Sequence, residues 1–312
     1  MVEWASGLAT GNELGPGKGW MRRSMDKSIQ RAIELIGNAK HVVALTGAGI
    51  STPSGIPDYR SPKSGLWKKA EDMVEVASTY GFRHQPDKFY EWLRPLLDVI
   101  RQATPNPAHV ALAQLEAAGH LQAIITQNID LLHGRAGSRT VYEVHGHLRE
   151  IVCPACHYLT AAADALDAFM ARGVAPRCPR CRHVMKPNVV LFGDLLPRAT
   201  LRAAQAAVQA ADLMIVAGSS LEVSPAGDLP EVAQAHGARL IVVNFGPTHM
   251  DDAADVGIHA DVAEVLPRLA APWTAAPAAG PLSALMDMAA APLNALIAAL
   301  EPAEASASAA VR

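Results

Sequence analysis

The sequence predicts an α/β protein in which a parallel sheet carries helices on both faces and a smaller lobe is inserted into the sheet domain. Half of the 312 residues are hydrophobic, which is enough for a large core. Two stretches, 61–102 and 146–187, interrupt the alternation of strands and helices. Parallel strands buried on both faces are continuous apolar runs. Four such runs are flanked by helical sequence: Val42–Thr46, Leu121–Thr126, Leu213–Ala217 and Leu240–Asn244.

The beginning of the chain divides into a leader and a helix. Residues 1–27 contain five glycines and no apolar period, so we expect a flexible leader. From Ser28 onward, apolar residues recur at helical spacing, at Ile29, Ala32, Ile33 and Ile36. The folded chain is therefore expected to start near Ser28.

The two interruptions make the sheet domain discontinuous in sequence. We expect it to comprise 28–60, 103–145 and 188–270, and the smaller lobe to comprise 61–102 and 146–187. A fifth apolar run, Val189–Phe192, fits either a short strand or an extended loop. Residues 271–312 are rich in Ala and Pro, and their apolar period predicts two short amphipathic helices on a tail. That apolar stripe either packs on its own domain or contacts a partner or another part of the chain.

Composition excludes several classes of protein. A net charge of −3 argues against a general nucleic-acid binder, which is usually basic. No apolar stretch is long enough for a transmembrane helix, and the first 20 residues contain no secretory signal. Four cysteines are too few for a disulfide scaffold. We therefore expect a cytoplasmic protein that is not associated with a membrane.

The four cysteines form two close pairs. Cys153-x-x-Cys156 and Cys178-x-x-Cys181 are separated by 21 residues. Two such knuckles can close a tetrahedron of thiolates around zinc and leave no open coordination position. The spacing predicts one structural zinc ion in the smaller lobe, and two pairs of buried, reduced thiols are the alternative.

Basic residues surround the second cysteine pair. They indicate either a docking patch for an acidic protein or nucleic acid, or an ordinary solvated surface. They are Arg172, Arg177, Arg180, Arg182, His183 and Lys186.

Gly47-Ala48-Gly49 directly follows the first predicted strand. Glycines between a strand and a helix let the backbone approach a pyrophosphate, as in Rossmann-like folds. The match to the dinucleotide fingerprint is incomplete, because Thr52 occupies the third glycine position and no acidic residue closes the next strand. The glycines alone fit a nucleotide site or a plain tight turn. Gln127, Asn128 and Asp130 follow the second predicted strand, at the edge where such folds bind ligands.

An ordered set of motifs resembles the sirtuins, the NAD-dependent protein-lysine deacylases. The resemblance covers about Ser28 to Leu269. The motifs are Gly47-Ala-Gly-Ile-Ser-Thr-Pro-Ser-Gly-Ile-Pro-Asp-Tyr-Arg60, Pro105-Asn-Pro-Ala-His109, Thr126-Gln-Asn-Ile-Asp130, Glu143-Val-His-Gly146, the two Cys pairs, Lys186-Pro-Asn-Val-Val-Leu-Phe-Gly-Asp194, Gly218-Ser-Ser-Leu221 and Val243-Asn-Phe-Gly246.

The resemblance implies a Rossmann-like fold with a zinc-ribbon lobe, and an enzyme that consumes NAD while transferring the acyl group of an acyl-lysine protein to ADP-ribose. His145 would be the general base, Asn128 would order the nicotinamide ribose, and Asp130 would receive the nicotinamide amide. Peptide contacts are implied for Val190, Leu191 and Phe192. The implied NAD contacts are Gly47, Ala48, Gly49, Thr52, Asp58, Tyr59, Arg60, Gln127, Asn128, Ile129, Asp130, His145, Gly218, Ser219, Ser220, Asn244, Asp261 and Val262.

The acyl group and the exact activity stay open in the sequence. Sirtuins that remove succinyl or malonyl groups carry Tyr-x-x-Arg, whereas Leu93 is the third residue after Tyr90 here. This favours a neutral acyl group, acetyl first and longer apolar chains second. A mono-ADP-ribosyltransferase and a non-catalytic NAD-binding scaffold are the alternative functions, and a dehydrogenase fits the incomplete glycine fingerprint less well.

Overall fold

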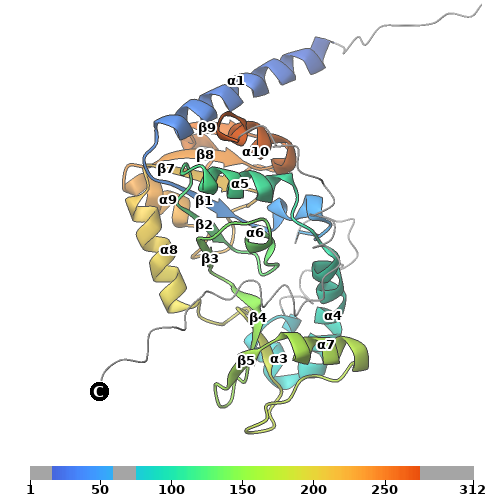
Figure 1. Ribbon diagram of the computed structural model, residues 1–312. Coiled ribbons are helices and arrows are strands. Elements are labelled where there is room, and N and C mark those ends of the chain that lie inside the picture. The colour runs from blue at the N-terminus through green and yellow to red at the C-terminus, as the bar shows by residue number, and fades with distance from the viewer. Residues whose placement is uncertain (1–15, 59–74, 275–312) are drawn as a thin grey trace, which may run out of the picture.

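The structure is a computed structural model that describes residues 16–58 and 75–274, with side chains from residue 23 onward (Figure 1). Its larger domain is built on a parallel sheet, as the sequence predicts. The sheet has six strands, in the order β3-β2-β1-β7-β8-β9. These strands are β1 (Val42–Thr46), β2 (Ala123–Thr126), β3 (Val141–Glu143), β7 (Leu213–Ala217), β8 (Arg239–Val243) and β9 (Val256–Ile258).

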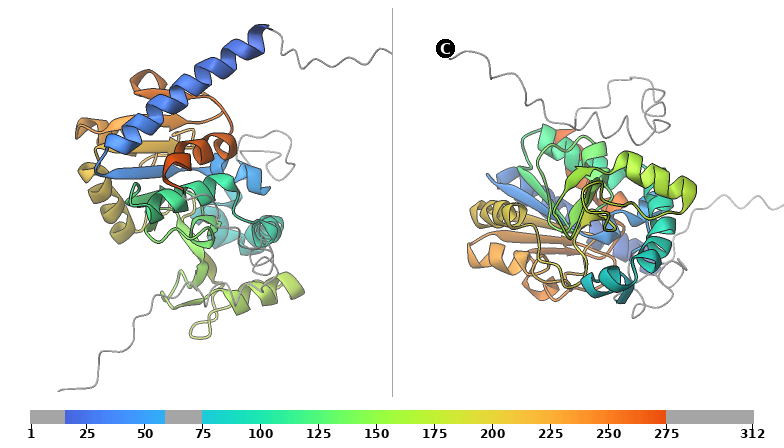
Figure 2. Two further views of the ribbon diagram at one scale, coloured as in Figure 1. Left: turned by 45° about the horizontal axis from the view of Figure 1, so that its top comes forward. Right: turned by 90° about the horizontal axis from the view of Figure 1, so that it is seen from below.

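The described helices cover both faces of this sheet (Figures 1 and 2). Because successive strand residues point to opposite faces, Val42 and Ala44 pack with α1, α5 and α10, whereas Val43 and Leu45 pack with α8 and α9. The helices of this domain are α1 (Pro16–Asn38), α5 (Pro107–Ala117), the short α6 (Leu132–Arg135), α8 (Arg198–Ala210), α9 (Leu229–Ala235) and α10 (Val262–Ala270).

The smaller lobe has its own sheet and its own apolar core, which includes Phe89, Leu93 and Phe169. The sheet is antiparallel and its strand order is β5-β4-β6. The described elements of the lobe are α3 (Thr79–His84), α4 (Pro86–Gln102), β4 (Gly146–Val152), β5 (Leu159–Ala161), α7 (Ala163–Arg172) and β6 (Lys186–Val189).

Two predicted boundaries at the lobe differ in the structure. The lobe was expected to end at residue 187, but β6 runs from Lys186 to Val189 and pairs with β4, so 188 and 189 belong to the lobe sheet. The predicted run Val189–Phe192 shares only Val189 with that strand. Beyond it the backbone is extended but forms a single isolated bridge, between Phe192 and Ser78.

Both ends of the predicted sheet domain also shift. Helix α1 begins at Pro16, so the predicted flexible leader is helical from that residue. The helix extends because Met25 packs on the core and Asp26 pairs with Arg268 of α10. The short 3₁₀ turn Ala271–Trp273 continues from α10, and Trp273 packs on the same core. The amphipathic helices predicted for the tail lie outside the described residues.

None of the helices in the described part of the chain is long and apolar enough to cross a membrane.

Candidate active site and metal centre

The glycine turn after β1 lies directly against the turn after β7. The Gly49 N–H donates to the Gly218 carbonyl oxygen (2.8 Å), and a Cβ at Gly49 would lie 2.8 Å from that same oxygen. Gly218 has φ +62°, and a Cβ there would lie 2.2 Å from the nitrogen of Ile50. Side chains are therefore excluded from both positions. The turns meet between β1 and β7, where the strand order reverses, which is where open α/β sheets bind nucleotides.

Two amide side chains after β2 reach the same turns. Asn128 Nδ2 donates to the Gly47 carbonyl oxygen (3.0 Å) and to Ser51 Oγ (3.1 Å). Gln127 Nε2 donates to Ser219 Oγ (2.9 Å). The predicted residues that follow β1, β2 and β7 thus form one hydrogen-bonded cluster.

Asp130 is buried below this cluster, with 5% of its surface exposed. Ser51 Oγ donates to its Oδ2 (2.6 Å) and the Leu132 N–H donates to its Oδ1 (2.9 Å). Burial raises the pKa of the Asp130 carboxyl, and these two hydrogen bonds oppose that rise. The carboxylate is held in a fixed orientation by donors from η1–η2 (Ala48–Ile50 and Thr52–Ser54) and from α6.

Sequence reasoning assigned no role to Ser51 or His109, which support Asp130. The Asn106 N–H donates to His109 Nδ1 (3.4 Å) in the capping box of α5, and burial lowers the pKa of His109 to about 4. The ring is therefore neutral with its proton on Nε2, which lies 3.5 Å from Ser51 Oγ. Ser51 can accept from His109 and Asn128 while it donates to Asp130. Both residues stand inside the quoted motifs, but their meeting depends on the packing of α5 against η1.

His145 lies at the junction between the sheet domain and the smaller lobe. Its Nδ1 faces the Gln127 carbonyl oxygen at 3.0 Å, so Nδ1–H donates and Nε2 keeps a free lone pair. Burial lowers the pKa of His145, and the bond to Gln127 opposes this effect. A neutral imidazole of this kind can accept a proton near pH 7. His147, for which no role was predicted, lies 3.7 Å from Glu150 Oε2.

The predicted peptide-binding stretch, Val190–Phe192, is hydrogen-bonded to the main chain of His145. The Val190 N–H donates to the His145 carbonyl oxygen (2.8 Å). Phe192 exchanges main-chain hydrogen bonds with Ala77 (3.0 Å) and Thr79 (2.9 Å) of the lobe. Leu191 is buried in the lobe core, whereas 41% of Phe192 is exposed. This extended stretch therefore lies between the two parts of the molecule.

Some predicted residues are not brought into the cluster. The Val262 side chain is 4% exposed and packs in the sheet-domain core. The cofactor contact predicted at this residue stays a prediction. Asp261 caps α10 by accepting from the Ala263 N–H (2.8 Å), and Asn244 Nδ2 donates to the Gly246 carbonyl oxygen (2.9 Å). Tyr59 and Arg60 lie outside the described residues.

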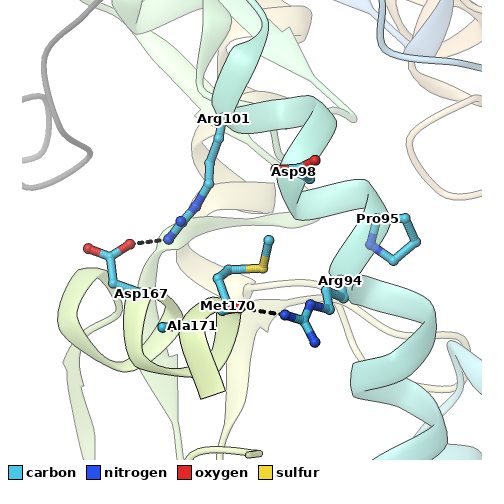
Figure 3. Close-up of a pocket in the computed structure, with 7 residues that line it drawn as sticks. All are labelled: Arg94, Pro95, Asp98, Arg101, Asp167, Met170 and Ala171. Carbon is cyan, nitrogen blue, oxygen red and sulfur yellow. Dashed lines mark hydrogen bonds and ion pairs between the residues drawn. The ribbon is translucent and has the colours of Figure 1, made fainter. Parts of the chain in front are cut away.

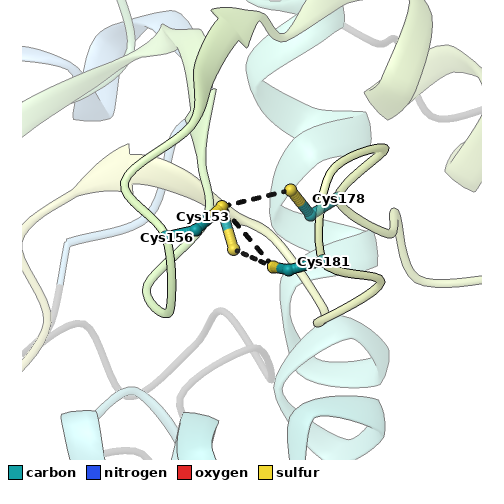
Figure 4. A group of neighbouring side chains, drawn as sticks. All are labelled: Cys153, Cys156, Cys178 and Cys181. Atoms are coloured by element: carbon teal, nitrogen blue, oxygen red, sulfur yellow. Dashed lines mark hydrogen bonds between the residues drawn. The ribbon is translucent and has the colours of Figure 1, made fainter.

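The four cysteine thiols converge from two loops of the smaller lobe (Figure 4). All four Sγ atoms lie within 4.8 Å of one another, and the Cys153–Cys181 and Cys156–Cys178 sulfurs are 3.4 and 3.5 Å apart. Tetrahedral zinc, with Zn–S bonds of about 2.3 Å, would hold sulfurs about 3.8 Å apart.

The two knuckles have the same backbone geometry. The residues after Cys156 and Cys181, which are His157 and Arg182, have φ +58° and +65°. Each donates its N–H to the carbonyl oxygen of the first cysteine in its pair, at 2.9 Å. This repeated turn fits a closed four-thiolate zinc site, whose role is structural because all the coordination positions are filled by protein.

A hollow of about 650 Å³ lies between α4 and α7, away from these residues (Figure 3). Arg94 Nη2 donates to the Met170 carbonyl oxygen (2.6 Å) at its wall, and Arg101 pairs with Asp167. No residue predicted for the active site lines it. The lining residues are Arg94, Pro95, Asp98, Arg101, Asp167, Met170 and Ala171.

The side-chain-free contact between the β1 and β7 turns and the separate thiolate lobe define a Rossmann-type nucleotide-binding protein with a zinc ribbon. Known proteins agree with this class. The sequence pattern of the Sir2 family matches residues 47–225. The chain belongs to the Sir2 family.

Individual relatives match most of the chain. It is 45% identical to the NAD-dependent protein deacylase 2 of Archaeoglobus fulgidus, over 78% of this chain and 96% of the relative. It is 42% identical to the NAD-dependent protein deacetylase of Thermotoga maritima, over 77% and 96%. A solved structure of Sir2 with a p53 peptide and NAD⁺ has a TM-score of 0.71 and 40% identity, over 78% of this chain and 98% of that one.

Proposed function

We propose that this protein is an NAD-dependent protein-lysine deacylase that removes acetyl groups and transfers them to ADP-ribose. Its relatives carry deacylase and deacetylase names. The single observation that carries the proposal is the arrangement of Asn128, Asp130 and His145 around the glycine turns. A protein that only bound a nucleotide would have no use for a neutral histidine held with one free nitrogen beside the cluster.

The described residues fit NAD. A Cβ at Gly49 or Gly218 would strike the backbone of the opposite turn, so glycine is needed for the two turns to meet at the sheet edge where open α/β folds bind a pyrophosphate. In the proposal, Asn128 orients the nicotinamide ribose and the Asp130 carboxylate accepts from the carboxamide. NAD, when bound, supplies the ribose carbon that takes the acyl oxygen, with nicotinamide as the leaving group.

His145 is assigned the proton transfer. With Nδ1–H bound to the Gln127 carbonyl oxygen, its Nε2 accepts a proton from a ribose hydroxyl. The acyl-lysine is expected to lie along Val190–Phe192, at the boundary between the sheet domain and the smaller lobe. Because the Val190 N–H donates to the His145 carbonyl oxygen, the stretch expected to bind the substrate lies next to the proposed base.

The acyl group in the proposal is neutral. The Tyr90 hydroxyl donates to the Met185 carbonyl oxygen (2.6 Å), and Leu93 is 1% exposed within the lobe core. Both side chains of the Tyr-x-x-Leu sequence are thus occupied in apolar packing, and this sequence offers no cation to a carboxylated acyl group. Acetyl is the first expectation, and longer apolar acyl groups are the second.

The proposal includes a cytoplasmic location, because the four thiols of the zinc site stay reduced most readily in a reducing compartment.

The test is a set of peptides that share one sequence and carry acetyl-, butyryl-, myristoyl-, succinyl- or unmodified lysine. Each is mixed with NAD, and nicotinamide, free lysine and acyl-ADP-ribose are measured by mass spectrometry. The proposal expects all three products in equal amounts from the acetyl peptide and none from the unmodified one. ADP-ribose attached to protein without lysine deacylation would instead establish the transferase alternative.

A further inference from the structure

The second cysteine knuckle lies in a segment of one charge sign. Residues 168–193 contain five cations and no aspartate or glutamate, although the whole chain has a net charge of −3. Lys186 is neutralised by Asp194 at 3.0 Å. The remaining four arginines, Arg172, Arg177, Arg180 and Arg182, are all exposed, and we call them the ribbon face.

The ribbon face has no counter-charge in the described part of the chain. The ion pairs among the described residues join other side chains, and none places a carboxylate within 4 Å of these four arginines. Single arginines without a carboxylate partner occur elsewhere on the described surface, as at Arg83 and Arg239, but the ribbon face gathers four on one short segment. Four uncompensated guanidinium groups on one short segment produce a local positive potential.

Two of these arginines are held in place. The Arg180 guanidinium lies 4.7 Å from the centre of the Tyr158 ring, which follows the first knuckle. Arg177 Nη1 donates to the Arg182 carbonyl oxygen (3.3 Å) on the second knuckle. The paired knuckles therefore present these guanidinium groups with less conformational freedom than arginines on a loose loop, which lowers the entropic cost of binding a partner.

We propose that the ribbon face docks an acidic segment of the acyl-lysine protein, outside the residues that enter the active site. The inference rests on the proposed deacylase function. Arginine binds carboxylates through two parallel hydrogen bonds. A protein segment is favoured over nucleic acid because apolar side chains lie beside the cations: Val174 is 63% exposed and Leu159 is 46% exposed. Apolar contacts of this kind suit a polypeptide better than a phosphate backbone.

The chain connectivity limits where that acidic segment lies in the substrate. Arg182 is eight residues before Val190, where the peptide is expected to pair. Extended backbone rises about 3.3 Å per residue, so Arg182, the nearest arginine of the ribbon face in sequence, lies at most about 26 Å from Val190. Acidic residues about six to ten positions from the acyl-lysine can reach it, on whichever side the bound peptide runs toward the knuckles.

The experiment uses the zinc-loaded full chain and three acetyl-lysine peptides. One is neutral, one carries four glutamates six to ten residues before the lysine, and one carries them after it. The variant is Arg177→Gln, Arg180→Gln and Arg182→Gln together. The matched control is Arg198→Gln with Arg202→Gln, two exposed arginines on α8 of the other domain. Zinc content and thermal unfolding are measured for each protein.

In the wild-type protein, one acidic peptide should have a kcat/KM about tenfold above the neutral peptide, through KM, because about three exposed ion pairs add up to that factor. The gain should shrink as salt is raised. The triple variant should lose the gain and keep its activity on the neutral peptide, whereas the α8 control should keep both. Equal kcat/KM for all three peptides, or a gain that survives in the triple variant, would overturn the docking surface.

Two further measurements separate the proposals from each other. Fluorescence anisotropy of a labelled acidic peptide measures docking without turnover. If the ribbon face binds this peptide but the protein deacylates no peptide, only the deacylase function is refuted. Competition by a short DNA duplex that exceeds competition by free acidic peptide would assign the ribbon face to nucleic acid and overturn the proposal as stated.

Discussion

Replacing Gly49 with alanine tests the contact between the β1 and β7 turns most directly. The new Cβ would lie 2.8 Å from the Gly218 carbonyl oxygen and 3.0 Å from its Cα, and both are backbone atoms that cannot rotate away. Ordinary contact begins near 3.4 Å, so the two turns must separate by about 0.6 Å. That movement stretches the Gly49 N–H to Gly218 carbonyl hydrogen bond from 2.8 Å toward the limit of a useful bond.

The magnitude follows from these two effects. Overpacking costs about 1–3 kcal/mol, and a weakened hydrogen bond costs about 1 kcal/mol. We expect the free energy of unfolding to fall by about 2–4 kcal/mol. Because the displaced backbone is the proposed pyrophosphate cradle, we expect KM for NAD to rise by about tenfold or more, since about 1 Å of misplacement can cost 10²-fold.

The assay is an initial-rate titration of NAD at saturating acetyl-lysine peptide, beside thermal unfolding. Gly257→Ala is the matched control, because nothing lies within 4 Å of its new Cβ and its φ is not positive. It should change neither quantity appreciably. An unchanged KM for NAD in Gly49→Ala would refute the reasoning, and so would equal damage in the Gly257→Ala control.

The other predictions concern the active-site residues, the metal centre and the core of the smaller lobe. His145→Ala should still exchange labelled nicotinamide into NAD but lose about 10²- to 10⁴-fold in deacylation; loss of NAD binding as well would make His145 structural. Asp130→Ala should instead lose the exchange. Because burial lowers the pKa of His145, its neutral form persists below the ordinary value of 6.5, so the acid limb of kcat/KM should have its midpoint below pH 6.5; a midpoint above pH 6.5 would contradict this. Cys153→Ser should lose zinc, measured by elemental analysis, and unfold the lobe; stable, metal-free, active protein would remove the structural role. Leu93→Arg should lower the melting temperature by burying an unpaired charge in the lobe core; a stable variant that gains succinyl-lysine activity would show that Leu93 faces the acyl group.

The strands that the sequence predicts best are the ones buried on both faces. β1 and β7 have their predicted bounds because both are wholly buried and, apart from Thr46 at the end of β1, apolar. The edge strands β3 and β9 were not predicted. They have only three residues each, and β3 is half-exposed along its length, so neither contains a long apolar run.

The site could be predicted where it follows from strand ends and could not where it depends on packing between distant segments. Gln127 and Asn128 were found because they directly follow a buried strand. Ser51 and His109 are 58 positions apart, and only the packing of α5 brings them together. The burial of the Val262 side chain could not be predicted either: it lies at the start of α10, where helical geometry turns it into the core.

His145, the proposed base, is bonded to Gln127 of the sheet domain and also adjoins the zinc lobe, whereas the glycine turns lie in the sheet domain. His145 is followed at once by Gly146, which opens β4 of the zinc lobe at φ +77° and leaves no room for a Cβ beside the Asn188 carbonyl oxygen (2.2 Å). The glycine turns rest on β1 and β7 of the other sheet. Damage to the metal centre would therefore disturb the proposed base, on its zinc-lobe side, more than it disturbs the glycine turns. A molecule that has lost its zinc would then still bind NAD without turning it over, and so would withhold NAD from intact molecules.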